Sequence, residues 1–305
     1  MNDNPRVAHG FEFHPSDEIF GLRSGSGRPI EIVTGRVPDA QGTLVGEWTE
    51  IPGKRTPTTV STLTHGTFLV VVGSMARFLV EPGRITAEFR PNLPAPLQSK
   101  LLMSTPVALL LYSAGTLGLH AGAVEVGGRA ILIAATGGSG KTTLTTAFHL
   151  AGHRLLGDDL AAVGSEATVF PAQALVRVRP QTAEWLRTKL SNTTPLWSAD
   201  GHEFHEIALD RRGSGDPVPV AAIVILGWSE NGPQLTTIPP AIAIQALWDK
   251  TFYLADGTGA AVTLDRLGDL VDAVPAYRLD RPRDLDQLDA TVSLLASELL
   301  PGSSP

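Results

Sequence analysis

The first 95 residues alternate short apolar runs with turn-forming residues. IEIVTGRV (30–37) and TFLVVVG (67–73) have the length and the β-branched content of strands, and ARFLVEPGRITAEFR (76–90) predicts two strands around a Pro-Gly turn. This pattern predicts a small β-rich domain over residues 1–95. The region carries no catalytic motif, and its scattered histidines, His9, His14 and His65, are interpreted as surface or packing residues.

Beyond residue 96, helical and strand-like patterns alternate. Ser104-Thr105-Pro106 is typical of a helix start, because serine or threonine caps a helix and proline fits its first turn. The later patterns predict strands at 117–135 (two, around Gly127-Gly128), 154–163, 168–180 (a strand pair) and 218–228, and helices at 141–152, 181–190 and 283–300. We therefore expect an α/β domain over residues 96–305.

Composition narrows the class of protein. The 305 residues carry a formal net charge of −7 with both signs interspersed, so a basic groove for nucleic acid is not expected. There is no cysteine, which fits a reducing compartment, and the N-terminal residues lack the apolar core of a signal peptide. The uncharged stretch 101–119 contains Ser104, Pro106 and two glycines, so we interpret it as a buried helix and expect a cytoplasmic protein without a membrane span.

A glycine-rich loop follows the strand that ends near Ala135. The pattern Ala135-x-x-x-x-Gly140-Lys141-Thr142 fits a Walker A loop whose first glycine is replaced by alanine. In such a loop the backbone N–H groups and the following helix N-terminus bind phosphate, the lysine contacts the outer phosphates, and the hydroxyl binds Mg²⁺. Gly137, Gly138 and Gly140 supply the backbone freedom, and the pattern predicts ATP and Mg²⁺ as cofactors.

Asp158 and Asp159 are adjacent at the end of a predicted buried strand. Two neighbouring carboxylates repel each other unless a cation or a proton lies between them. Because side chains alternate along a strand, one carboxylate can face Mg²⁺ while the other faces an incoming hydroxyl. A switch or motor needs only the first, so the second carboxylate favours a phosphotransferase, in which the acceptor hydroxyl must lose a proton.

The order of these features resembles the catalytic domain of the HPr kinase/phosphorylase family. His120 precedes Lys141 by 21 residues, and the segment GHRLLGDD places Asp158 sixteen residues after Thr142. The loop also looks like that of ATP-dependent phosphoenolpyruvate carboxykinase, whose fold is related. Segments 218–228, 233–247 and 274–292 resemble HPr-kinase-related proteins encoded beside peptide-modification genes, some of which phosphorylate a C-terminal serine of a lasso-peptide precursor. The resemblance covers residues 96–300.

The resemblance implies a P-loop kinase fold and a role for each motif residue. Gly138, Ser139, Gly140, Lys141, Thr142 and Thr143 would hold the nucleotide phosphates. Asp158 would be the base that takes the acceptor proton, and Asp159 the metal-side carboxylate near Thr142, although these two roles are exchangeable. His120 would lie beside the phosphate site, where it steadies the acceptor phosphate or Asp158; a core histidine is the alternative.

The sequence also departs from the family. The glutamate-bearing segment of HPr kinases has no clear counterpart here, Glu203 and Glu206 being the nearest candidates, and Arg211 and Arg212 are either transition-state cations or residues of a solvated loop. The N-terminal region does not resemble that of HPr kinases, which weakens HPr itself as the substrate. The expected partner is therefore a precursor peptide with an acceptor serine. An HPr-type kinase/phosphorylase, a small-molecule kinase and a non-catalytic nucleotide sensor remain alternatives, and homo-oligomerisation is left open.

Overall fold

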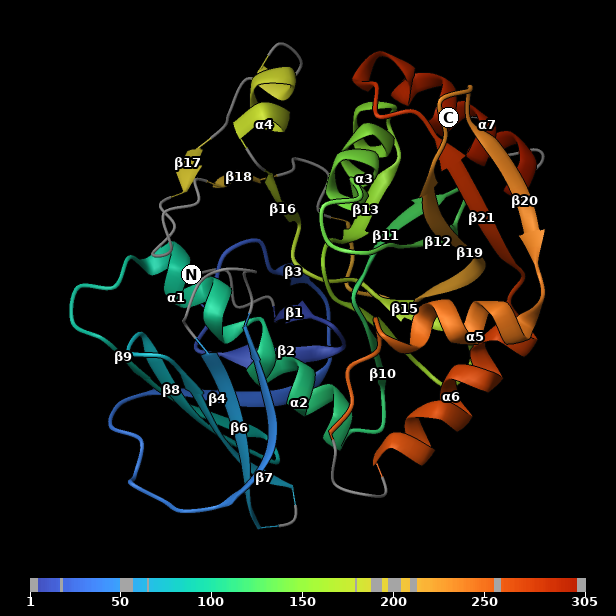
Figure 1. The fold of residues 1–305 in the computed structure, drawn as a ribbon. Helices are drawn as coiled ribbons and strands as arrows, with labels where there is room; N and C mark the ends of the chain where they lie inside the picture. The colour runs from blue at the N-terminus through green and yellow to red at the C-terminus, as the bar shows by residue number, and fades with distance from the viewer. Residues whose placement is uncertain are drawn as a thin grey trace.

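A computed structural model describes residues 5–16, 19–49, 57–64, 66–178, 180–187, 194–196, 204–208, 213–254 and 259–300. Among these residues the N-terminal strands form a nine-stranded sheet in the order β3-β1-β2-β4-β9-β8-β7-β6-β5. Its strands are β1 (Arg6–Ala8), β2 (Phe11–His14), β3 (Arg23–Ser24), β4 (Arg28–Thr34), β5 (Thr43–Thr49), β6 (Pro57–Thr64), β7 (Thr67–Val72), β8 (Ala76–Glu81) and β9 (Arg84–Phe89). We call it the N-terminal sheet; it lies at the lower left of Figure 1.

The strand predictions for this region are confirmed. The Pro-Gly turn joins β8 to β9, which pair antiparallel, and Phe78, Val80, Ile85 and Ala87 alternate inward. Two helices cover the buried face: α1 (Ala95–Leu102) and α2 (Thr105–Ser113). Proline occupies the first turn of both, as the sequence indicates for α2.

The uncharged stretch 101–119 is divided between three elements. It comprises the end of α1, the whole of α2 and β10 (Leu117–Leu119). Seven consecutive residues of α2, from Thr105 to Leu111, are buried. No helix within the described part of the chain is both long and apolar enough to cross a bilayer.

A second sheet of nine strands, described over residues 117–281, surrounds the strand that leads into the glycine loop. Its main order is β10-β14-β15-β19-β12-β11-β13, and β21 pairs with β19 and with β20. The strands besides β10 are β11 (Ala121–Val126), β12 (Arg129–Ala134), β13 (Arg154–Gly157), β14 (Ala161–Val163), β15 (Thr168–Phe170), β19 (Val218–Trp228), β20 (Gln234–Ile238) and β21 (Ala276–Arg281). Strands β12, β19 and β21 are parallel neighbours, so their C-terminal ends meet at one edge.

Helices cover both faces of this second sheet, which we call the loop sheet (Figure 1). On one face Ile131 and Ile133 of β12 pack with α3 (Lys141–Leu150) and α7 (Leu288–Leu299), which follows the 3₁₀ turn η1 (Leu285–Gln287). On the other face Leu132 and Ala134 pack with α5 (Pro240–Trp248) and α6 (Gly259–Ala273). Burial on both faces explains why β12 and β19 are continuous apolar runs rather than alternating ones.

One sequence prediction about this region is wrong in its details. Segment 168–180 contains two strands, but they do not pair with each other: β15 joins the loop sheet, whereas β16 (Leu175–Val178) pairs with β18 (Phe204–Ala208). β18 also pairs with β17 (Thr194–Leu196), and α4 (Pro180–Arg187) follows β16. Pro171 lies between β15 and β16, and a proline removes a ladder donor, so the chain leaves one sheet there for another.

The N-terminal sheet contacts the loop sheet and the chain after β15 through hydrogen bonds from a buried arginine and from the backbone. Arg23 of β3 is fully buried, and its guanidinium donates to the carbonyl oxygens of Leu155 (2.6 Å) and Ala172 (2.7 Å). The backbone N–H of His9 donates to the carbonyl of Pro171 at 2.8 Å. The N-terminal sheet therefore packs directly behind β13, the strand that precedes the acidic pair, and the division at residue 95 stays a prediction.

Candidate phosphate-binding site

The glycine loop runs from Ala135 to Gly140, between the end of β12 and the start of α3. Gly138 (φ 79°) and Gly140 (φ 81°) adopt the left-handed backbone conformation that side chains disfavour. A Cβ atom built on Gly137 or Gly138 would meet nothing within 4 Å, so this side of the loop faces space. Within the loop, the Ser139 hydroxyl lies 2.8 Å from that of Thr136. The glycine loop thus joins β12 to α3, and its open face can admit an anion.

Helix α3 begins directly at the loop and has no side-chain cap. Gly140 is its N-cap residue, and the first turn contains no acidic side chain. The first N–H groups of a helix lack intrahelical partners and carry the positive end of the helix dipole. The N–H groups of Lys141, Thr142 and Thr143 are in this position, which is the standard arrangement for binding phosphate.

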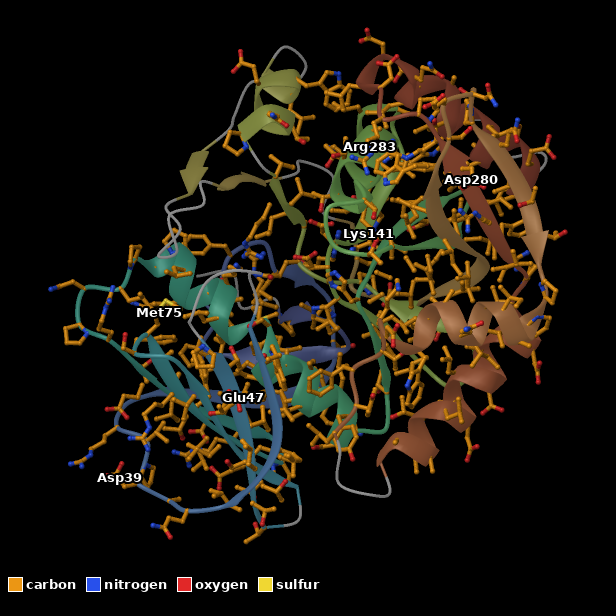
Figure 2. All side chains as sticks on the ribbon, in the orientation of Figure 1. Asp39, Glu47, Met75, Lys141, Asp280 and Arg283 are labelled. Atoms are coloured by element: carbon orange, nitrogen blue, oxygen red, sulfur yellow. The ribbon has the colours of Figure 1, made fainter. Side chains whose placement is uncertain are left out.

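Lys141 is buried, and its ammonium group lies against the loop. Nζ donates to the carbonyl of Ala135 at 3.1 Å and to Nε2 of His120 at 3.0 Å. Desolvation by burial lowers the pKa of Lys141, whereas the charges of Asp159 and Asp158 act in the opposite direction. Figure 2 labels Lys141 at the start of α3. An ammonium held at this point can contact the outer phosphates of a nucleotide bound at the loop.

His120 is held in one neutral tautomer. An ammonium has only donors, so Nε2 accepts from Lys141, and Nδ1 carries the proton that it donates to the Asp159 carbonyl at 3.0 Å. Desolvation and then the charge of Lys141 lower the pKa of His120, although the residue keeps an exposed surface. His120 lies between β10 and β11. Its backbone N–H donates to the Lys250 carbonyl at 2.6 Å. His120 therefore joins the site and is not a core histidine.

Thr142 contacts Asp158, the first member of the acidic pair. The Thr142 hydroxyl lies 3.0 Å from Oδ1 and 3.1 Å from Oδ2 of Asp158. Burial and then the charge of Asp159 raise the pKa of Asp158 to about 7, against the opposing effects of Thr142 and Lys141. The sequence assigns the carboxylate near Thr142 to Asp159, but the described contact is to Asp158. The geometry thus favours the exchanged assignment that the sequence leaves open.

Asp159 is exposed and adopts a positive φ of 66°. Strand β13 ends at Gly157, and the N–H of Leu160 donates to the Asp158 carbonyl at 2.8 Å, so the pair lies in a tight turn after the strand. The acidic pair therefore follows the strand in a turn, and does not lie in the strand itself, as the argument from strand alternation assumes. Aspartate tolerates the left-handed region better than most residues. One carboxylate is therefore held against Thr142, and the other is accessible to an incoming molecule.

The donor set fits a magnesium ion. The Thr142 hydroxyl and the Asp158 carboxylate are hard oxygen donors beside an anion-binding loop. Magnesium is usually held by one or two carboxylates together with substrate phosphates. Among the described residues, no three acidic, histidine or cysteine side chains gather into a metal cage. The residues Glu203, Arg211, Arg212 and His65 lie outside the described part of the chain, as does the side chain of Glu206.

Three residues of the loop's surroundings are not predicted by the sequence analysis. Arg281, at the end of β21, is buried and donates to the carbonyls of Ser139 (3.4 Å) and Gly140 (3.3 Å). Its guanidinium lies 4.9 Å from the Trp228 ring centre, and that of Arg283 lies 4.5 Å from the same ring. β19 is the parallel neighbour of β12 and β21 that of β19, which brings the ends of both strands toward the loop, but this pairing is not part of the local sequence pattern.

Comparisons with known proteins add little to this geometry. No family model matches the chain, and no curated protein matches it. Among solved structures it is similar to the Hpr(Ser) kinase/phosphatase from Coxiella burnetii, with 12% identity over 58% of this chain and 93% of that one, at a TM-score of 0.31. A TM-score of 0.31 is too low to establish a common fold.

Proposed function

We propose that this chain is an ATP- and Mg²⁺-dependent phosphotransferase that transfers the γ-phosphate to a hydroxyl group. One observation carries the proposal: at the start of α3, Asp158 contacts Thr142 while Asp159, the next residue, remains exposed beside Lys141. A nucleotide switch needs the first carboxylate only. A second, accessible carboxylate at the phosphate end is what a hydroxyl acceptor requires, because the hydroxyl must give up its proton.

The loop and α3 would hold the nucleotide. The uncapped N–H groups at the start of α3, those of Lys141, Thr142 and Thr143, would bind the phosphates, and Lys141 would exchange its contact with the Ala135 carbonyl for phosphate oxygens. Thr142 and Asp158 would hold Mg²⁺, which when bound neutralises charge on the β- and γ-phosphate oxygens. Asp158 would therefore take the metal-side role, and a bound cation would offset the desolvation and the Asp159 charge that raise the pKa of this half-buried group.

Asp159 would act as the base. The acceptor oxygen forms a bond to the γ-phosphorus, the bond between that phosphorus and the β–γ bridging oxygen breaks, and ADP leaves with the electron pair. The acceptor proton passes to the Asp159 carboxylate. His120 supports this arrangement: its Nδ1–H holds the Asp159 carbonyl, and its Nε2 fixes the Lys141 ammonium, so one ring links the base to the phosphate-binding lysine. His120 is thus a positioning residue.

We further propose a serine of a peptide as the acceptor, in the manner of the kinases that modify lasso-peptide precursors. The support is the sequence resemblance of segments 218–228, 233–247 and 274–292 to HPr-kinase-related proteins encoded beside peptide-modification genes. The exposed position of Asp159 and the solvent-accessible surface of His120 leave room for a chain segment to approach the site.

The test is phosphorylation of defined acceptors by the full chain with ATP and Mg²⁺, followed by mass spectrometry. We expect a mass gain of one phosphate on a precursor-like peptide ending in serine, and none on the same peptide ending in alanine. Phosphorylation of HPr, or of glycerol and free serine, would reassign the acceptor class. If the chain binds ATP and modifies none of these hydroxyls, the phosphotransferase proposal fails and a nucleotide sensor replaces it.

A further inference from the structure

Arg281 places a buried positive charge behind the glycine loop. The residue is 3% exposed and ends β21, the parallel neighbour of β19 in the loop sheet. Its Nη2 atom donates to the carbonyl oxygens of Ser139 and Gly140 at 3.4 Å and 3.3 Å, and Nη1 donates to that of Pro282 at 3.4 Å. A Cβ on Gly140 would lie 2.5 Å from Nη2, so the guanidinium is tightly packed on this glycine.

Within the described residues this charge has no acidic partner. Asp280, its neighbour in sequence, pairs instead with Arg278 at 2.9 Å, and Asp284 accepts from the N–H of Asp286. The Nε atom of Arg281 is buried without a described hydrogen-bond partner. Burying an uncompensated charge costs free energy, and burial accordingly lowers the pKa of Arg281. Packing alone therefore does not explain an arginine at this position.

Through the two carbonyl groups that it contacts, Arg281 acts on two backbone N–H groups of the glycine loop. A peptide unit is planar and trans, so its C=O and N–H bonds point in opposite directions. The peptide units with the Ser139 and Gly140 carbonyls carry the N–H groups of Gly140 and Lys141. Arg281 binds the carbonyl end of each, which leaves both N–H groups directed away from it. A hydrogen bond to the carbonyl polarises the peptide unit and makes its N–H a stronger donor.

Trp228 fixes the guanidinium in this orientation. The Arg281 guanidinium lies 4.9 Å from the centre of the indole ring, within the range of a cation–π contact. The same ring edge would be 3.8 Å from a Cβ on Gly140, so the tryptophan, the arginine and the loop form one packed unit. The aromatic face supplies the only described compensation for the charge besides the three carbonyl oxygens.

We infer that Arg281 is a positioning residue for the oligophosphate part of the nucleotide, acting through the Gly140 and Lys141 amides rather than by touching the ligand. The inference rests on the proposed function only in that a nucleotide binds the loop. The Arg281 guanidinium lies on the carbonyl side of these two peptide units. A bound phosphate would place its negative charge on their N–H side, so the dipole of each peptide unit would have a favourable charge at both ends. Arg281 thus raises affinity for any oligophosphate, whether or not a nucleoside is attached.

The experiment measures the affinity of full-length protein for ATP and for inorganic tripolyphosphate by calorimetry. Arg281→Met keeps most of the volume and removes the charge, and we expect both dissociation constants to rise by the same factor, about 10–100-fold, the usual effect of losing charged hydrogen bonds. Arg281→Lys keeps one donor group and should restore part of the affinity. Trp228→Leu should weaken both ligands a few-fold.

Arg278→Met is the matched control, because it removes an exposed cation from the same strand without touching the loop. It should leave both affinities unchanged. The ligand-free Arg281→Met protein should not melt below the parent, since the variant removes a buried charge that has no described carboxylate partner. A purely structural role predicts the opposite: a lower Tm, with affinity lost only in proportion to unfolded protein and no recovery in the lysine variant.

Three results would overturn the inference. They are unchanged affinity in the methionine and lysine variants, loss of ATP affinity with tripolyphosphate affinity retained, and the structural pattern just described. Loss of ATP affinity alone would mean that Arg281 affects binding of the nucleoside part of ATP and not of its phosphates. The proposed function fails separately: if the parent binds both probes but phosphorylates nothing, the phosphotransferase reading falls and the role of Arg281 stands. A parent that binds neither probe excludes both.

Discussion

The glycine loop has two flanks of opposite character. The acidic flank comprises His120, Asp158 and Asp159, where a neutral imidazole and two carboxyl groups lie near the Lys141 ammonium, and His120 and Asp159 are exposed. The basic flank comprises Trp228, Arg281 and Arg283, with a buried guanidinium against the loop carbonyls and no described carboxylate partner. The acidic flank can exchange protons and admit an acceptor, whereas the basic flank can only shape the loop electrostatically.

This contrast suggests that the acidic flank contributes to catalysis and the basic flank to nucleotide binding. Under the proposed function, residues on the acidic flank should affect mainly kcat or the metal requirement, because they would face the transferred phosphate. Residues on the basic flank should affect mainly nucleotide affinity, because they act on the loop amides. Lys141 lies between the flanks and contacts both the histidine and the loop carbonyl of Ala135. The predictions below test this division.

Lys141→Ala should have the largest effect. The substitution removes the point charge from the outer phosphates in a desolvated site, and we expect phosphotransfer to fall by at least about 10³-fold. The fold should be retained, because the lysine is a buried charge and its two contacts are local. The measurement is the rate of peptide phosphorylation at saturating ATP, together with a thermal melt.

Arg129→Ala serves as the control for this variant. Arg129 is exposed and begins β12, at the opposite end of the strand that leads into the loop. It should leave the rate unchanged. A Lys141→Ala protein with the parental turnover rate would contradict the assignment of the loop as the phosphate site.

The two aspartates should respond differently to the same change. Asp159→Asn removes the proposed base, so kcat should fall by about 10²–10⁴-fold with little change in ATP affinity. Asp158→Asn weakens the metal side, so its main effect should be a Mg²⁺ requirement raised by about 10–100-fold. A Mg²⁺ titration of both variants with a serine peptide distinguishes them. If excess Mg²⁺ rescues the Asp159 variant and not the Asp158 variant, the roles are reversed.

The acidic flank could be predicted from the sequence because its members lie close together along the chain. His120, the loop and the acidic pair span 40 residues, and the spacing between them is part of a recognisable motif. What the spacing could not supply is which carboxylate meets Thr142. The carboxylate that contacts Thr142 depends on the residue at which β13 ends and on the left-handed conformation of Asp159. Moving the end of the strand by one residue would exchange the two aspartates, and sequence patterns do not locate strand ends that accurately.

The basic flank was missed for a physical reason. Arg281 lies 141 residues from Gly140 in sequence, and only the order of strands in the sheet brings them together. The sequence predicts β19 as a buried strand but not its parallel pairing with β12, and it interprets residues 274–282, which include β21, only by resemblance. Likewise, the apolar runs of the N-terminal region predict strands, but not that Arg23 would reach the backbone of β13. The local hydrophobic pattern therefore predicts the individual strands and helices, whereas the pairing of strands far apart in the sequence decides which residues become neighbours.

Asp158→Asn should also stabilise the protein without metal or nucleotide at neutral and alkaline pH. Burial and Asp159 raise the pKa of Asp158 to about 7 from the ordinary value of 3.8, so the folded state binds this proton more tightly than the unfolded state. The parent therefore loses stability as the pH rises from about 4 to about 7. Asparagine carries no such cost. The rise in pKa from 3.8 to about 7 corresponds to about 4 kcal/mol, and because Asp158 is only half-buried we expect the variant to gain part of this above pH 7, about 1–2 kcal/mol or a few degrees in Tm.

The measurement is a series of thermal melts in a chelator between pH 4 and pH 8.5. The difference between variant and parent should be near zero at pH 4 and constant above pH 7. Asp159→Asn should show part of the same gain, because the charge of Asp159 is the second cause of the raised pKa. Added Mg²⁺ should reduce the difference by stabilising the parent. A difference that is the same at every pH would show that ionisation of Asp158 is not its cause.

The smallest effect is the coupling between the two flanks, and it tests the comparison most directly. Arg281→Met should change the ATP dissociation constant, and Asp159→Asn should change kcat at saturating ATP. If the basic flank acts only through the loop amides, the double variant should combine the two effects, with a coupling below about threefold, since groups without shared partners are nearly additive. The cycle is measured from kcat and from ATP affinity in the four proteins. A coupling of tenfold or more in kcat would mean that Arg281 alters the geometry at the base, and the separation of binding from chemistry at the loop would then be wrong.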